Sequence, residues 1–213
     1  MIMDERPFFD WIRSDAPSAE ERLLVEKVGV YQDLFDDMLF EPGTETYELV
    51  QSQSLNTKTG YWIEDEVPRP NILTCFSTSF LKYRVEELDG MLGYYNPDEQ
   101  LICVSPEGLK NDRNILHEMI HVFEGIINEL PMYYHDMLFW GLYKSLKKRI
   151  PMLDNIISDH AHLLTGTTLD NYGGVHDILF LLKSFDLDIQ MGYHLGTVFG
   201  YGRIDDFKDC EYE

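Results

Sequence analysis

The segment from residue 111 to residue 128 constrains the fold more than any other part of the chain. Its apolar residues recur every three or four positions, which predicts a helix with a broad buried face; they are Ile115, Leu116, Met119, Ile120, Phe123 and Ile127. Within this apolar pattern stand His117, Glu118 and His121. Burying two imidazoles and a carboxylate is costly unless each has a partner. The fold must therefore bury this helix and also give these side chains a partner.

The rest of the chain has the patterns of both helices and strands. A hairpin is predicted from two short apolar runs, 91–95 and 101–105, because the residues between them, Asn96 to Gln100, favour a turn. The segment 46–84 is rich in Tyr, Val, Ile, Thr and Phe and is broken by prolines, which favours two or three strands. Apolar spacing and stop signals predict four further helices, at about 18–40, 136–150, 152–164 and 176–185.

These elements predict an α+β fold, a small twisted sheet packed against the helix of residues 111–128. Without repeats or long linkers, the chain is expected to form a single domain, 1–213. Within it we distinguish a helical lead-in (1–45), a sheet with metal-binding helices (46–150) and a helical or irregular extension (151–213). The pattern between 187 and 213 does not assign a structure to that segment.

Charge and composition narrow the range of partners. The 17 basic and 38 acidic residues give a formal net charge of −21, which disfavours binding to phosphate backbones. No apolar run approaches the roughly 20 residues that span a membrane, and the first residues lack a signal-peptide pattern, so we expect a cytoplasmic protein. Three cysteines, without a close pair, fit neither a disulfide framework nor a cysteine zinc cluster.

The pentapeptide from His117 to His121 predicts a zinc site. Residues four apart on a helix lie on the same side, so both imidazoles can reach one ion at about 2.0 to 2.1 Å. Glu118 projects from an adjacent edge of the helix, where it is suited to take a proton from an activated water. We therefore predict Zn2+ as the cofactor, His117 and His121 as ligands and Glu118 as the catalytic base.

A catalytic zinc site needs a third protein ligand, and several residues are candidates. The prediction is His135, which follows a proline-containing loop and stands just before the helix expected at 136–150. Glu124 is a weaker candidate because it shares the helix of the first two ligands. Four rival ligands lie on the later helix, and two more histidines are expected to be surface or core residues; these are Asp154, Asp159, His160 and His162, and then His176 and His194.

The region from Gly93 to Trp140 resembles the SprT-like family of zinc metallopeptidases. The resemblance covers about 50 residues: Gly93-Tyr94-Tyr95, Ile102 to Ser105, Ile115 to His121, His135-Asp136 and Phe139-Trp140. It implies a zincin-like fold, zinc ligands at His117, His121 and His135, and a general base at Glu118. It also implies that the hairpin strand ending at Ser105 borders a substrate cleft. The chain lacks the basic surface and cysteine zinc ribbon of members that act on DNA-crosslinked proteins.

Two functions follow as hypotheses. The favoured one is a zinc-dependent metallopeptidase whose substrate is a protein or peptide, with Glu118 as general base. The second is a non-catalytic, zinc-containing acidic module that binds a basic protein partner. The presence of Glu118 beside the two histidines favours the enzyme, because a purely structural zinc site does not use a base.

Overall fold

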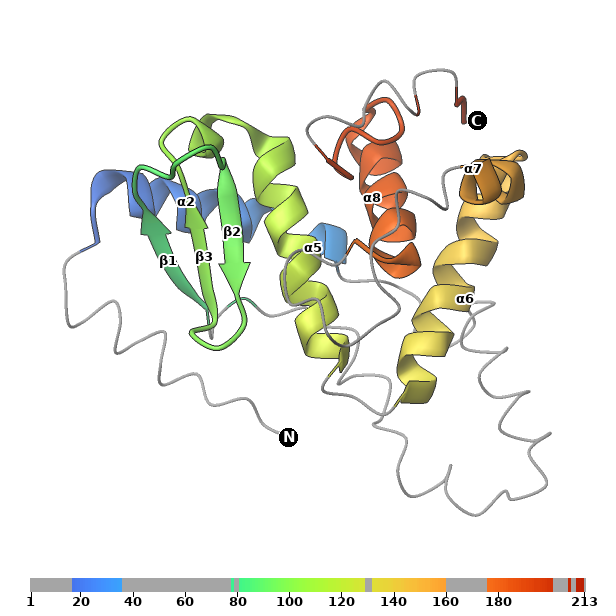
Figure 1. Cartoon of the computed structure of the whole chain (residues 1–213), viewed down its shortest axis with the longest axis horizontal. Coiled ribbons are helices and arrows are strands. Elements are labelled where there is room, and N and C mark those ends of the chain that lie inside the picture. The colour runs from blue at the N-terminus through green and yellow to red at the C-terminus, as the bar shows by residue number, and fades with distance from the viewer. Residues whose placement is uncertain are drawn as a thin grey trace, which may run out of the picture.

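A computed structural model describes residues 17–35, 78, 81–128, 132–159, 176–200, 207 and 210–212, with the backbone alone described for 127, 128 and 132–138. Within these residues the protein contains five α-helices, two short 3-10 helices and a three-stranded sheet. This mixture confirms the predicted α+β class. The sheet lies at one end of the molecule, α5 runs beside it, and α8 and α6 follow on the far side of α5 (Figure 1).

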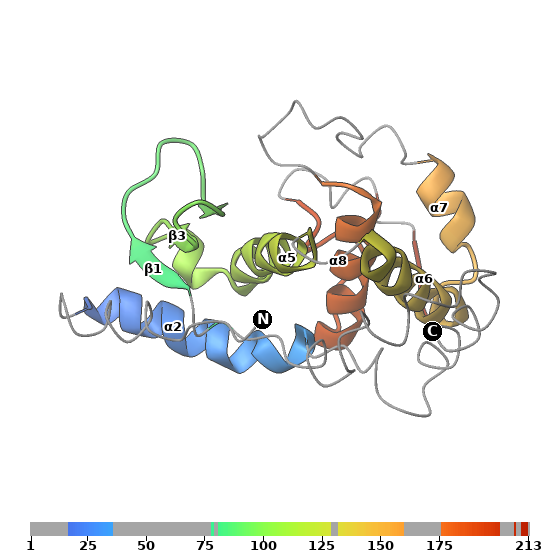
Figure 2. The ribbon, with the colours of Figure 1, turned by 90° about the horizontal axis from the view of Figure 1, so that it is seen from below.

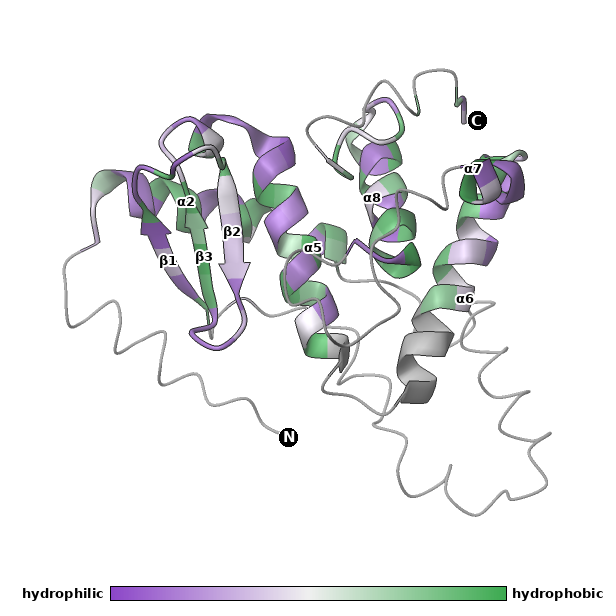
Figure 3. Ribbon diagram, viewed as in Figure 1, coloured by the Kyte–Doolittle hydropathy of each residue, from purple (hydrophilic) through white to green (hydrophobic). Residues whose placement is uncertain are grey.

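The sheet consists of β1 (Lys82–Val85), β2 (Gly93–Asn96) and β3 (Leu101–Val104), in the order β1-β3-β2. The predicted hairpin is confirmed, because β2 and β3 pair antiparallel with Asn96 opposite Leu101. All four residues of β3 are buried, and β3 is the most hydrophobic of the three strands (Figure 3). Strand β3, which ends at Val104, is thus the centre of the sheet, and β2 is the edge strand that packs against α5.

The predicted N-terminal helix forms α2 (Ala19–Tyr31), which continues into the 3-10 helix η1 (Gln32–Phe35). Ser18 caps it by accepting a hydrogen bond from the Glu21 N–H, and the Glu21 carboxylate accepts one from the Ser18 N–H. This helix lies across one face of the sheet and passes under α5 (Figure 2). Residues 36–77, which include most of the predicted early strands and Cys75, lie outside the described part.

The helix predicted at 111–128 is α5 (Asp112–Asn128), and the 3-10 helix η4 (Gly108–Lys110) leads into it. Its apolar face is buried, with Ile115, Leu116, Met119 and Ile120 fully inaccessible. The approach of this region to β2 is close, because a Cβ on Gly108 would lie 2.0 Å from the Leu92 carbonyl oxygen. A glycine is therefore needed where the chain enters α5.

The remaining helices are α6 (Met132–Arg149), α7 (Leu153–Asp159) and α8 (Ile178–Met191). Helix α6 begins at Met132 and not at Asp136 as predicted, which places His135 inside a helix and not in the loop before it. Helix α8 extends beyond the predicted end to Met191 and stops at Gly192, whose φ is 70°. Residues 160–175 lie outside the described part. Among the described residues no helix is long and apolar enough to cross a membrane.

Candidate metal centre

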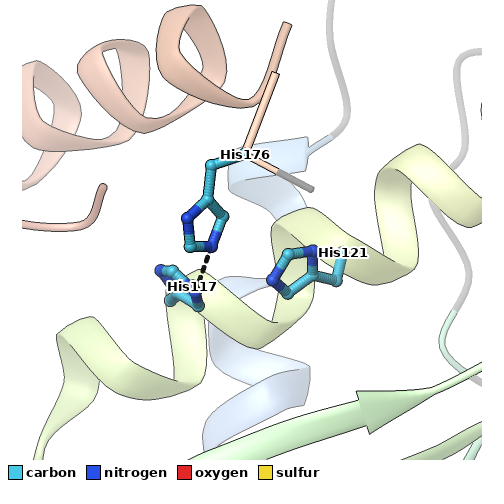
Figure 4. Close-up of side chains that lie close together, drawn as sticks. All are labelled: His117, His121 and His176. Atoms are coloured by element: carbon cyan, nitrogen blue, oxygen red, sulfur yellow. Dashed lines mark hydrogen bonds between the residues drawn. The ribbon is translucent and has the colours of Figure 1, made fainter. Parts of the chain in front are cut away.

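Three histidines meet between α5 and the start of α8. His117 and His121 project from α5, and His176 lies two positions before the first residue of α8 (Figure 4). One ring nitrogen from each of the three lies within 4.8 Å of the corresponding nitrogens of the others. Two segments far apart in sequence therefore bring three imidazoles to one point.

The beginning of α8 fixes the position of His176. Asp177 caps this helix by accepting a hydrogen bond from the Phe180 N–H at 2.9 Å, so the residue before it is held against α5. The Phe180 ring packs against all three imidazoles, with centroid distances of 4.9 Å to His117, 4.7 Å to His121 and 4.5 Å to His176. One apolar side chain thus forms the common wall of the cluster.

The hydrogen bonds of His117 determine which of its nitrogens faces the cluster. Its Nδ1 lies 2.9 Å from the carbonyl oxygen of Val198, which can only accept, so Nδ1 is the donor. Its Nε2 then carries a lone pair, and lies 3.1 Å from Nε2 of His176. Two nitrogens bound to one tetrahedral zinc at about 2.0 to 2.1 Å would be about 3.3 Å apart. The observed separation is close to that value.

The environment keeps the imidazoles neutral. Burial, followed by the neighbouring histidines, lowers the pKa of His117 to about 4 and that of His121 to about 2. Burial also lowers the pKa of His176. Only neutral imidazole binds a metal ion, so these shifts leave all three able to act as ligands in the neutral pH range.

Glu118 is buried on the side of α5 that faces β2, and only 3% of the residue is exposed. Its carboxylate accepts a hydrogen bond from the Tyr95 N–H, and a Cβ on Gly93 would lie 3.2 Å from its Oε1. Burial raises the pKa of Glu118 to about 8. A carboxyl group with this pKa is a proton donor and acceptor in the neutral range, as general acid–base chemistry requires.

Two further acidic groups stand at the edge of the histidine cluster. Glu124 Oε2 lies 3.6 Å from Nδ1 of His121, and its side chain is hydrogen-bonded to Asp177. Burial, followed by the neighbouring Asp177, raises the pKa of Glu124 well above its usual range. A carboxyl that retains its proton is a poor metal ligand, so Glu124 fits a supporting role better than direct coordination.

Of the remaining candidate ligands, some are described outside the histidine cluster and others lie outside the described residues. Asp154 binds Tyr143 and Lys147 on the surface of α6 and α7, away from the histidine cluster. His194 is exposed after α8, and His160 and His162 lie outside the described residues. The side chain of His135 is also outside the described part, so its role as a ligand stays a prediction.

His176 is the member of the cluster that sequence reasoning does not select. It stands 55 positions beyond His121, and sequence alone predicts an ordinary surface or core histidine there. A usable signal exists, since the pair His176-Asp177 immediately precedes a strongly apolar helix, where aspartate is a typical cap. A residue before such a cap is fixed in place and packed against whatever the helix buries.

The donor set fits a metal ion that imidazole binds, and zinc is one such ion. Three neutral imidazoles from two rigid elements, with one of them oriented by a backbone carbonyl, are the ligands and the outer-shell support that catalytic zinc sites use. No protein family, curated protein or solved structure matches this chain. The function must therefore be inferred from the residues of the site itself.

Proposed function

We propose that the protein is a zinc-dependent peptidase with His117, His121 and His176 as ligands and Glu118 as general base. The observation that carries this proposal is the convergence of three imidazole nitrogens within 4.8 Å, beside a buried carboxyl on the same helix. The fold around α5, a sheet on one side and a helix bringing the third ligand on the other, is compatible with a zincin-like arrangement. The proposal assigns His176 the position that the motif resemblance gives to His135.

Each side chain has a distinct role in this proposal. The three histidines hold the ion, and Val198 keeps Nε2 of His117 directed toward it. A bound zinc ion supplies Lewis acidity, which activates water and polarises the scissile carbonyl. Glu118 accepts the proton of the attacking water on its carboxylate and delivers it to the leaving amine nitrogen. The Tyr95 N–H holds that carboxylate in a fixed orientation.

Metal content is the first test of the ligand assignment. Purified wild type is expected to bind one zinc, whereas His117→Ala, His121→Ala and His176→Ala are each expected to lose it. The matched control is His194→Ala, since this exposed histidine follows the same helix as His176 and should not change zinc content. Near-stoichiometric zinc in His176→Ala, together with its loss in His135→Ala, would contradict the proposed third ligand.

Cleavage of peptide bonds is the second test. Glu118→Gln keeps the shape of the side chain and removes the base, so zinc should remain while hydrolysis of an unstructured protein substrate falls by about 10²- to 10⁴-fold. Glu107→Gln, at an exposed carboxylate just before η4, serves as the control and should retain wild-type activity. Stoichiometric zinc without measurable cleavage in the wild type would instead support the acidic binding module.

A further inference from the structure

A tight turn follows α8 and reaches back to the metal centre. Asp188, buried in α8, accepts a hydrogen bond from the Val198 N–H at 3.0 Å through Oδ1. The backbone N–H groups of Gly196 and Thr197 also lie close enough to this carboxylate to lower its pKa, against the larger effect of burial, which raises it. Three successive amides of the turn are therefore gathered on one side chain. Because that side chain belongs to α8, the turn is fixed to the helix that also positions His176.

The geometry of the turn leaves it little freedom. Gly196 has a φ of 83°, which favours glycine, and a Cβ at this position would lie 2.3 Å from the ring of Phe207. Leu195, Val198 and Phe199 are buried. The turn is thus held by its backbone amides, by a glycine that accepts no side chain and by its packing in the core.

The carbonyl of Val198 is the link from the turn to the site. The Val198 N–H donates to Asp188, and the Val198 carbonyl oxygen accepts from Nδ1 of His117. One residue therefore connects the carboxylate to the proposed ligand. A carbonyl held at Nδ1 selects the imidazole form that is protonated there and leaves Nε2 for a metal. Moving this carbonyl would release His117 to exchange between its two neutral forms.

The unfavourable burial of the Asp188 carboxylate also indicates a role beyond packing. Its second oxygen, Oδ2, is buried and has no hydrogen-bond partner among the described residues. A buried polar atom without a partner destabilises the folded state. An apolar residue at this point in the core would avoid that cost but would not hold the three amides.

We propose that Asp188 is a positioning residue of the metal centre, acting through the turn at 195–199 and the Val198 carbonyl to fix the ring of His117. This inference rests on the proposed function, since it assigns His117 as a ligand. It makes the end of α8 a part of the site. It also predicts that Asp188 affects His117 in the metal-free protein.

The test reads the imidazole directly. Protein labelled with ¹⁵N-histidine is examined by NMR without metal, and zinc affinity is then measured by competition with a chelating dye. Wild type should show His117 protonated at Nδ1. In Asp188→Ala we expect a mixture of the two neutral forms of His117 and zinc affinity lower by about 10- to 100-fold. Asp188→Asn should fall between them, because its amide oxygen still accepts from Val198.

The control is Ser184→Ala, one turn earlier on α8. Its buried hydroxyl donates to the Leu181 carbonyl of the same helix, at 2.8 Å, so its loss affects the core without touching the turn. Both readouts should equal those of wild type. An equal effect of Ser184→Ala would overturn the proposal, because general loosening of α8 would then explain it.

The proposal is also overturned if Asp188→Ala folds and keeps both the wild-type form of His117 and the wild-type zinc affinity. Should that variant fail to fold, Asp188→Asn is judged by the same two readouts. Failure of the proposed function looks different. In that case zinc binding is absent or independent of His117 and His176, while the effect of Asp188 on the metal-free His117 spectrum is still observed.

Discussion

At the scale of single residues, burial decides the chemistry of this site. The same desolvation that lowers the pKa of His117 to about 4 raises that of Glu118 to about 8. His117 is thereby kept neutral, as a metal ligand must be, and Glu118 is brought into the range where it can exchange a proton. Two groups one position apart on α5 thus receive different roles from one environment.

The raised pKa of Glu118 predicts a pH-dependent stability of the metal-free protein. Between about pH 4.5 and 8 the folded protein holds a proton on Glu118 that the unfolded chain has released, so this group makes the free energy of unfolding fall as pH rises. From about pH 6.5 to 8 its contribution is roughly 1.5 to 2 kcal/mol. Urea unfolding in chelator at both pH values, for wild type and Glu118→Gln, measures it.

The comparison with Glu118→Gln separates this contribution from that of the three histidines. Burial lowers the pKa of each histidine, so the unfolded chain binds more protons there and the histidines act in the opposite direction as pH rises. Both proteins carry the same histidines, so the difference between them reports Glu118. Relative to wild type, Glu118→Gln should gain stability between the two pH values. An identical change in the two proteins would contradict the raised pKa of this carboxyl group.

At the scale of elements, two glycines together test the close packing where the chain enters α5: one lacks room for a side chain and the other has it. Gly108 has no room for a Cβ, whereas Gly29, exposed on α2, has nothing within 4 Å of that position. Gly108→Ala should lower the free energy of unfolding by roughly 1 to 3 kcal/mol, because the backbone must shift. Gly29→Ala should raise it by about 0.5 to 1 kcal/mol, since alanine favours a helix. Thermal and urea unfolding of both variants check this, and a stabilising Gly108→Ala would refute the close approach.

The elements with a clear period are predictable from sequence, and those without one are not. Helices α2 and α5 and the hairpin of β2 and β3 follow their patterns, because apolar residues three and four positions apart mark the helices and turn residues mark the hairpin. Helix α8 is longer than its pattern predicts because it is buried around nearly its whole circumference, including Lys183, Ser184 and Asp188. Such a helix lacks a polar face, and its last turn shows no helical period.

The candidate site is predictable only within one helix. The spacing of His117 and His121 is local, so sequence alone places both on one side of α5. His176 reaches them through the packing of α8 on α5, and no pattern of spacing reports a contact between distant segments. The side chain of His135, the predicted third ligand, lies outside the described part.

At the scale of the whole molecule, the proposed metal joins the two halves of the structure. Zinc would bridge α5, which packs on the sheet, and the start of α8, which packs against α6. Binding only to the folded state stabilises it by roughly 2.7 kcal/mol when free zinc is about 100 times its dissociation constant. We therefore expect chelation to lower the melting temperature of wild type and not that of His176→Ala. Calorimetry with and without chelator measures the difference, and an equal decrease in both proteins would contradict it.

The third histidine, His176, lies late in the sequence, so the site can form only late in synthesis. His117 and His121 leave the ribosome well before His176, and His176 is held only once α8 has formed behind it. Chains grow from the N-terminus, so a nascent polypeptide carries the pair without its completing partner for much of its elongation. A hydrolase built in this way would stay inert toward its own unfinished chain and its neighbours on the polysome until α8 has emerged and docked.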